Sequence, residues 1–166
     1  MLGQGDPGLK EMIQEVLRGP SRGQNIKYDL CCVAGTWPDL LPLIFEALDE
    51  GRIHDTRVNE QIHLLGTLGD VEGGVSTHLA ELARWWLGLD VDFLKADDGY
   101  RLRFGEFRGL RADQYPEGAL DYSKLDAEIT WNVAQEQPYY PSQELHVAAA
   151  FALYRMTVRG LRVDKK

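Results

Sequence analysis

The chain has 166 residues, and its 18 Lys and Arg residues against 26 Asp and Glu residues give a net charge of −8 and a pI near 5.0. This balance excludes a generally basic nucleic-acid binder, and the length predicts one globular domain over residues 1–166. The sequence has no apolar run of the roughly 18–20 residues that cross a bilayer and begins with no signal-like segment, so we expect a cytoplasmic protein without membrane contact.

The first predicted helix begins at Asp6-Pro7, a capping acceptor followed by a proline, and ends before Gly19-Pro20. Its apolar residues recur at the spacing of one helix face, which we expect to be packed: Leu9, Met12, Ile13, Val16 and Leu17. The apolar run at 28–34 is compatible with a buried strand or with a short helix. It contains the adjacent Cys31 and Cys32, which we expect to be reduced thiols.

Three helices with short connections follow. The leucine-rich spacing after Trp37 predicts a helix that Gly51 ends, and the later patterns predict helices over about 55–68 and 76–87. We expect the 55–68 helix to bury its apolar residues, which are Val58, Ile62, Leu65 and also Leu64.

The run from Pro38 to Leu48, followed by a helix that ends in Leu-Gly-Thr-Leu-Gly-Asp at Asp70, resembles the helical hairpins of HEAT-like repeats. The resemblance covers residues 38–89 and implies packed helix pairs. A solenoid needs at least about three stacked units, whereas this stretch holds about one and a half, so a helical bundle is the alternative architecture. We carry no function over from the resemblance.

The apolar period changes near residues 91–107, where apolar residues alternate with polar ones around Asp97-Asp98-Gly99 and predict a β-hairpin. Helices are predicted again over about 122–135 and 142–159. The last helix has scarcely any polar face, so we expect it to be central and covered on most sides. The predicted fold is mainly α: a single-domain helical bundle with HEAT-like helix pairs and one inserted hairpin.

The acidity is concentrated in the first half of the chain. Residues 1–90 hold 14 acids and 7 bases, a net −7, whereas residues 91–166 hold 12 acids and 11 bases, a net −1. Such a run is compatible with a solvated face and also with a docking surface for a basic partner. The acidic residues around this helix pair are Asp39, Glu46, Asp49, Glu50, Asp55 and Glu60.

The adjacent Trp85 and Trp86 point about 100° apart on a helix. Trp86 shares the apolar face of Leu79, Leu82 and Ala83, so we expect Trp86 to be buried and Trp85 to be exposed as an interface anchor. We therefore predict a non-enzymatic interaction module, of the immunity or inhibitor type or an accessory subunit, that binds a basic protein partner. The predicted binding residues are Trp37, Asp39, Glu46, Asp49, Glu50, Trp85, Arg101 and Arg103.

Other chemistries have weaker support in the sequence. The alternative function is a metal-assisted hydrolase that uses His54, His63, His78 and Glu81, although these histidines also fit ordinary turn, helix and core positions. The glycine-rich stretch 69–76 has Val75 where a phosphate-binding loop needs lysine. A basic stripe without interleaved aromatics makes nucleic-acid binding the weakest hypothesis; its residues are Arg101, Arg103, Arg108 and Arg111. We expect no cofactor.

Overall fold

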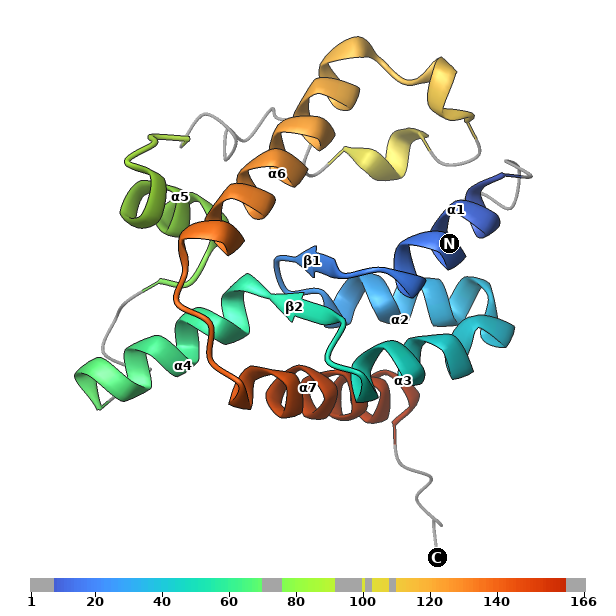
Figure 1. The fold of residues 1–166 in the computed structure, drawn as a ribbon. Coiled ribbons are helices and arrows are strands. Elements are labelled where there is room, and N and C mark those ends of the chain that lie inside the picture. Colours follow the sequence, from blue (N-terminus) through green and yellow to red (C-terminus); the bar gives the residue numbers. More distant parts are fainter. Residues whose placement is uncertain (1–7, 70–75, 92–99, 101–102, 108–109, 161–166) are drawn as a thin grey trace, which may run out of the picture.

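The computed structural model describes residues 8–69, 76–91, 100, 103–107 and 110–160, and the fold of this part is mainly α, as the sequence predicts (Figure 1). None of the described helices is long and apolar enough to span a membrane. In chain order the main elements are α1 (Leu9–Arg18), β1 (Ser21–Gly23), α2 (Lys27–Thr36), the short 3-10 turn η1 (Pro38–Leu40), α3 (Leu41–Asp49), β2 (Ile53–Asp55), α4 (Thr56–Leu68), α5 (Leu79–Leu87), α6 (Glu117–Glu136) and α7 (Ser142–Arg159).

The described residues contain one small sheet, and it is parallel. Strands β1 and β2 pair with Ser21 opposite Ile53 and Gly23 opposite Asp55. The stretch 28–34, which the sequence leaves open between strand and helix, lies in α2. Its buried residues Leu30 and Ala34 are four positions apart, on one side of that helix.

The predicted β-hairpin near residues 91–107 is wrong. Residues 92–99 and 101–102 lie outside the described part, but Phe104–Phe107 form a 3-10 helix instead of a strand. The chain turns here because Phe107 packs between two other aromatic rings, those of Tyr100 at 6.1 Å and Tyr115 at 5.3 Å between centroids. The sheet forms instead between two three-residue strands that precede α2 and α4.

The first core lies among α1, α2, α3, α7 and β2. Its buried residues are all apolar: Leu17, Ile26, Leu30, Ala34, Ile44, Ala47, Leu48, Ile53, Val147 and Phe151. The second core lies mainly between α5 and α6, which run side by side, and consists of Ala80, Leu82, Ala83, Val91, Ile129 and Val133.

The sequence overestimates the burial of α7. This helix buries Gln143, Val147 and Phe151 against α2, α3 and β2, whereas Leu145, Leu153 and Met156 are 59–73% exposed. Its neighbours thus cover one side of the helix, and the prediction of a central helix covered on most sides is wrong. Helix α1 behaves similarly: Leu17 is buried and Ile13 packs against the first core, but Met12 and Val16 are more than half exposed.

Candidate binding site

Helix α4 lies against α6, α7 and β2, and most of the side chains that it buries are polar. Thr56, Asn59 and Glu60 are each no more than 1% exposed, while Leu65 and Leu68 face solvent. The expected burial of Leu65 is therefore wrong, although Leu64 is buried. The segment that joins α6 to α7 supplies the partners of this polar face. We call the buried polar residues at this junction the polar layer, which consists of Asp55, Thr56, Asn59, Glu60, Gln137 and Gln143.

Asp55 organises the start of two helices. Its Oδ1 accepts hydrogen bonds from the backbone N–H groups of Arg57 and Val58, which caps α4. The same carboxylate accepts from the N–H groups of Asn25 at 3.0 Å and Ile26 at 2.9 Å, at the start of α2. Burial raises the pKa of Asp55, while the four N–H donors act in the opposite direction. Asp55, expected among the acids of a charged surface, is instead a buried structural residue.

Glu60 occupies the centre of the polar layer. Its Oε2 accepts hydrogen bonds from the indole Nε1–H of Trp86 at 2.8 Å and from Nε2 of Gln137 at 2.7 Å. The same amide of Gln137 also donates to the carbonyl of Thr56 at 3.1 Å. Both donors to the Glu60 carboxylate are thus neutral groups, and both lie on one of its two oxygens. Glu60 is 1% exposed, so it is not part of an acidic surface either.

A pocket of about 370 Å³ opens between α4 and α5 over this carboxylate. The ring of His63 stands edge-on to Trp86 at 5.5 Å between centroids, and its Nδ1 lies 2.7 Å from the hydroxyl of Tyr140. Leu68 and Trp85 are 62% and 47% exposed, so the pocket has an apolar edge in contact with solvent. Its lining residues are Glu60, His63, Leu64, Thr67, Leu68, Trp85 and Trp86.

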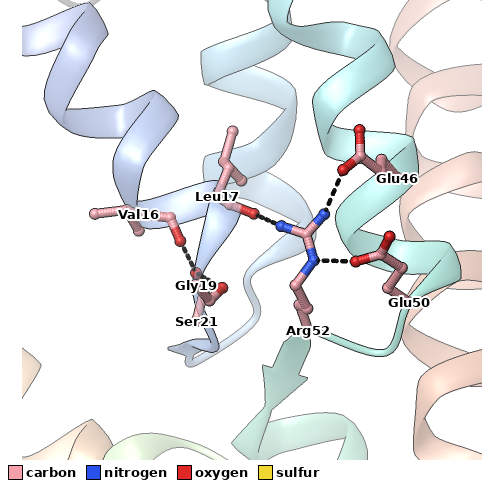
Figure 2. A network of polar contacts seen from close by, with 7 residues as sticks. All are labelled: Val16, Leu17, Gly19, Ser21, Glu46, Glu50 and Arg52. Atoms are coloured by element: carbon pink, nitrogen blue, oxygen red, sulfur yellow. Dashed lines mark hydrogen bonds and ion pairs between the residues drawn. The ribbon is translucent and has the colours of Figure 1, made fainter.

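The predicted acidic face lies on η1 and α3, and most of its carboxylates already have partners. Asp39 pairs with Lys10 at 2.6 Å, a hydrogen bond that lowers the pKa of Asp39. Glu46 and Glu50 both pair with one guanidinium, that of Arg52, at 3.0 and 2.8 Å. Figure 2 shows this guanidinium also donating to the carbonyl of Leu17 at the end of α1. The remaining predicted acid of α3, Asp49, is exposed at the end of that helix.

The predicted binding residues do not form one surface. Trp85 lies on α5 and the acids on η1 and α3, at opposite sides of the molecule in Figure 1, while Trp37 is half-buried after α2. Arg103 is held by Glu106 at 2.9 Å, and Arg101 lies outside the described residues. Among the described members of this set, only Trp85 lines the pocket between α4 and α5.

The candidate metal ligands are also dispersed. His54 in β2 lies with Nδ1 2.6 Å from Nε2 of Gln143, His63 contacts Tyr140, and His78 is exposed before α5. Burial, and to a lesser degree the charge of Arg22, lower the pKa of His54 to about 4. In the part of the chain that the structure describes, no three His, Cys, Asp or Glu side chains gather where they could hold a metal ion. The proposed set with Glu81 therefore has no shared geometry.

The sequence indicates Glu60 as an acidic residue and His63 as a candidate ligand, but it predicts no shared pocket for them. The available signal was a polar stripe, with Thr56, Glu60 and His63 spaced by four and three residues on one face of the predicted helix. Without knowledge of what packs against this helix, such a stripe indicates the solvent-exposed side of an amphipathic helix.

Comparisons of the chain with family models, with curated proteins and with solved structures find no match. The resemblance to HEAT-like hairpins over residues 38–89 therefore stays a prediction, and any function must be argued from the site itself.

Proposed function

We propose that the protein is a non-catalytic binding module that holds a segment of a basic protein partner in the pocket between α4 and α5. The pocket itself carries the proposal, because two exposed apolar side chains, Leu68 and Trp85, border a space that the acidic residue Glu60 also lines. Exposed aromatic residues beside a concave site are frequent anchors of protein interfaces. An apolar edge around one polar group gives both affinity and orientation.

The acidic residues of α3 have a different role in this proposal. Exposed ion pairs such as those of Glu46 and Glu50 with Arg52 are weak, so they neither anchor a partner nor prevent its approach. The net charge of −8 attracts a basic partner over distance and raises the rate of encounter. We assign the lifetime of the complex to Trp85 and the pocket. An immunity or inhibitor protein and an accessory subunit are both compatible with such a module.

The first test compares two tryptophans of similar exposure, Trp85 at 47% and Trp131 at 49%. Protein carrying Trp85→Ala or Trp131→Ala is used to capture partners from native lysate at low and at high salt. We expect the wild type and Trp131→Ala to retain the same basic protein and Trp85→Ala to lose it. Retention of that protein by folded Trp85→Ala, or no retention by the wild type, contradicts the proposal.

A second experiment localises the contact with a matched pair of threonines. Thr67 lines the pocket and Thr157 lies on the outer side of α7, and each hydroxyl donates to the carbonyl four residues earlier. A photo-crosslinking residue at position 67 is expected to link the retained protein covalently, and the same residue at position 157 is expected to leave it free. Equal crosslinking from both positions would place the partner elsewhere.

A further inference from the structure

We infer that the group bound in the α4–α5 pocket is a guanidinium, supplied by an arginine side chain of the partner and paired with the Glu60 carboxylate. This inference rests on the proposed function and specifies its ligand chemistry. It starts from the balance of charge at the site. Glu60 is 1% exposed, and no Lys or Arg among the described residues forms an ion pair with it. Carboxylates buried this deeply are normally paired with a cation.

The hydrogen bonds leave one oxygen of Glu60 for a ligand. Trp86 and Gln137 both donate to Oε2, and the described residues provide no hydrogen bond to Oε1. Glu60 lines the pocket, and we assign this second oxygen to a donor that enters there. The nearest basic residue along α5, Arg84, pairs with Asp90 at 3.5 Å and so does not supply the missing charge.

The aromatic lining favours a planar cation. Trp85, Trp86 and His63 all border the pocket, and the Trp86 ring is held in place by its bond to Glu60. Indole faces attract cations, and a guanidinium stacks on them while its N–H groups reach a carboxylate. The fold already uses this contact elsewhere, since the guanidinium of Arg22 lies 4.3 Å from the ring centroid of Trp131. The volume of about 370 Å³ is at the small end of ligand pockets and suits a single side chain.

The test uses two small probes of nearly the same shape, N-acetyl-arginine amide and N-acetyl-citrulline amide, which differ in the charge of the terminal group. Both are titrated into the full chain at constant ionic strength by calorimetry. The arginine probe is expected to saturate with a Kd on the order of millimolar, because one side chain supplies few contacts, and the citrulline probe is expected to bind at least about tenfold more weakly. Equal binding of the two probes, or no binding of the arginine probe, overturns the inference.

Variants connect the binding to the pocket. Glu60→Gln keeps an acceptor for Trp86 and removes the charge, so it is expected to weaken the arginine probe about tenfold, while Glu128→Gln on the exposed side of α6 is expected to leave it unchanged. Trp85→Ala, at an exposed position, is expected to weaken the probe several-fold even if Glu60→Gln folds poorly. Unchanged binding in folded Glu60→Gln or in Trp85→Ala contradicts the inference. If the arginine probe fails while crosslinking from position 67 persists, the ligand assignment is wrong and the proposed function stands; if both fail, both are wrong.

Discussion

Helices α3 and α4 are consecutive, joined only by a short turn and β2, and they bury opposite kinds of side chain. Helix α3 buries Ile44, Ala47 and Leu48 and places its carboxylates toward solvent. Helix α4 buries Thr56, Asn59 and Glu60 and leaves Leu65 and Leu68 exposed. Burial of polar groups costs free energy unless each is hydrogen-bonded, and exposed apolar side chains add nothing to the folded state. The burial of apolar side chains by α3 therefore stabilises the fold. The burial of polar side chains by α4 lowers the free energy of unfolding unless each is hydrogen-bonded, and it occurs beside the pocket.

The largest effect is expected in the apolar region, beneath α3. Phe151 is fully buried in the first core and meets the ring of Phe45 edge-on at 5.7 Å between centroids. Phe151→Ala removes this packing and leaves a cavity, which costs about 3–5 kcal/mol of unfolding free energy. Urea denaturation measures the loss. A cost below about 1 kcal/mol would mean that the first core does not dominate stability.

The next effect tests the polar side of the comparison at the start of α4. Asp55→Ala removes the acceptor of four backbone N–H groups, those at the start of α2 included. Loss of the cap and of partners for buried donors costs about 3 kcal/mol in total. Asp55→Asn is the control, because an amide oxygen in the place of Oδ1 retains three of the four bonds, and it should cost about 1 kcal/mol. Equal losses in both variants would show that the carboxylate charge, and not its hydrogen bonds, is what matters.

A pH titration tests the same junction through His54. The half-buried ring has a pKa of about 4 in the folded chain against an ordinary value of 6.5, so protons bind preferentially to the unfolded chain between these values. The contribution of neutral His54 to the free energy of unfolding is therefore fully present above pH 6.5 and is lost as the pH falls toward 4. Allowing for the partial exposure of the ring, the loss is about 2 kcal/mol. His54→Gln, measured at pH 7.5 and 4.5, should lose correspondingly less on acidification, whereas identical pH slopes would contradict the assignment.

A smaller effect is expected on the acidic side of α3. Arg52 connects Glu46 and Glu50 to the Leu17 carbonyl at the end of α1 (Figure 2). Arg52→Met is expected to cost about 1–2 kcal/mol, chiefly because the carbonyl loses its donor. Glu46→Gln should cost less than about 0.5 kcal/mol, because Arg52 keeps its other two partners. Thermal unfolding of both variants compares the loss of all contacts of Arg52 with the loss of one exposed ion pair. Equal losses of stability would contradict the assignment of Arg52 as the residue that connects them.

The sequence predicts the parts of this fold that depend on local pattern. Helix positions follow from apolar spacing and from glycine stops such as Gly51. In α5 the exposed position of Trp85 is confirmed, while Trp86, expected to be buried, is half-buried against the second core. These features depend on neighbours within one helix. Spacing within a helix is fixed by its 3.6-residue period, whatever packs on it.

The parts that fail depend on which surfaces meet. The apolar run of α7 indicates burial on most sides, but its neighbours cover only one. The polar stripe of α4 resembles a solvent-exposed face, yet the segment at Gln137 packs against it. The alternation near residues 100–107 predicts a strand, yet the aromatic residues there pack around a turn. Long-range packing decides all three, and a single sequence contains no direct record of it.

A small change in stability is also expected at Trp85, and its size separates folding from binding. Trp86 packs on the second core and donates to Glu60, so Trp86→Ala is expected to cost about 3 kcal/mol through lost packing and a lost donor to a buried carboxylate. Trp85 is 47% exposed on the same helix, and Trp85→Ala should cost less than about 1 kcal/mol. Urea denaturation of the two variants measures both losses of unfolding free energy. If Trp85→Ala keeps the stability of the wild type and still loses the captured partner, Trp85 contributes to binding and not to the fold. Should Trp85→Ala be the more destabilising of the two, the exposed position of its ring, and with it the apolar edge of the pocket, would be wrong.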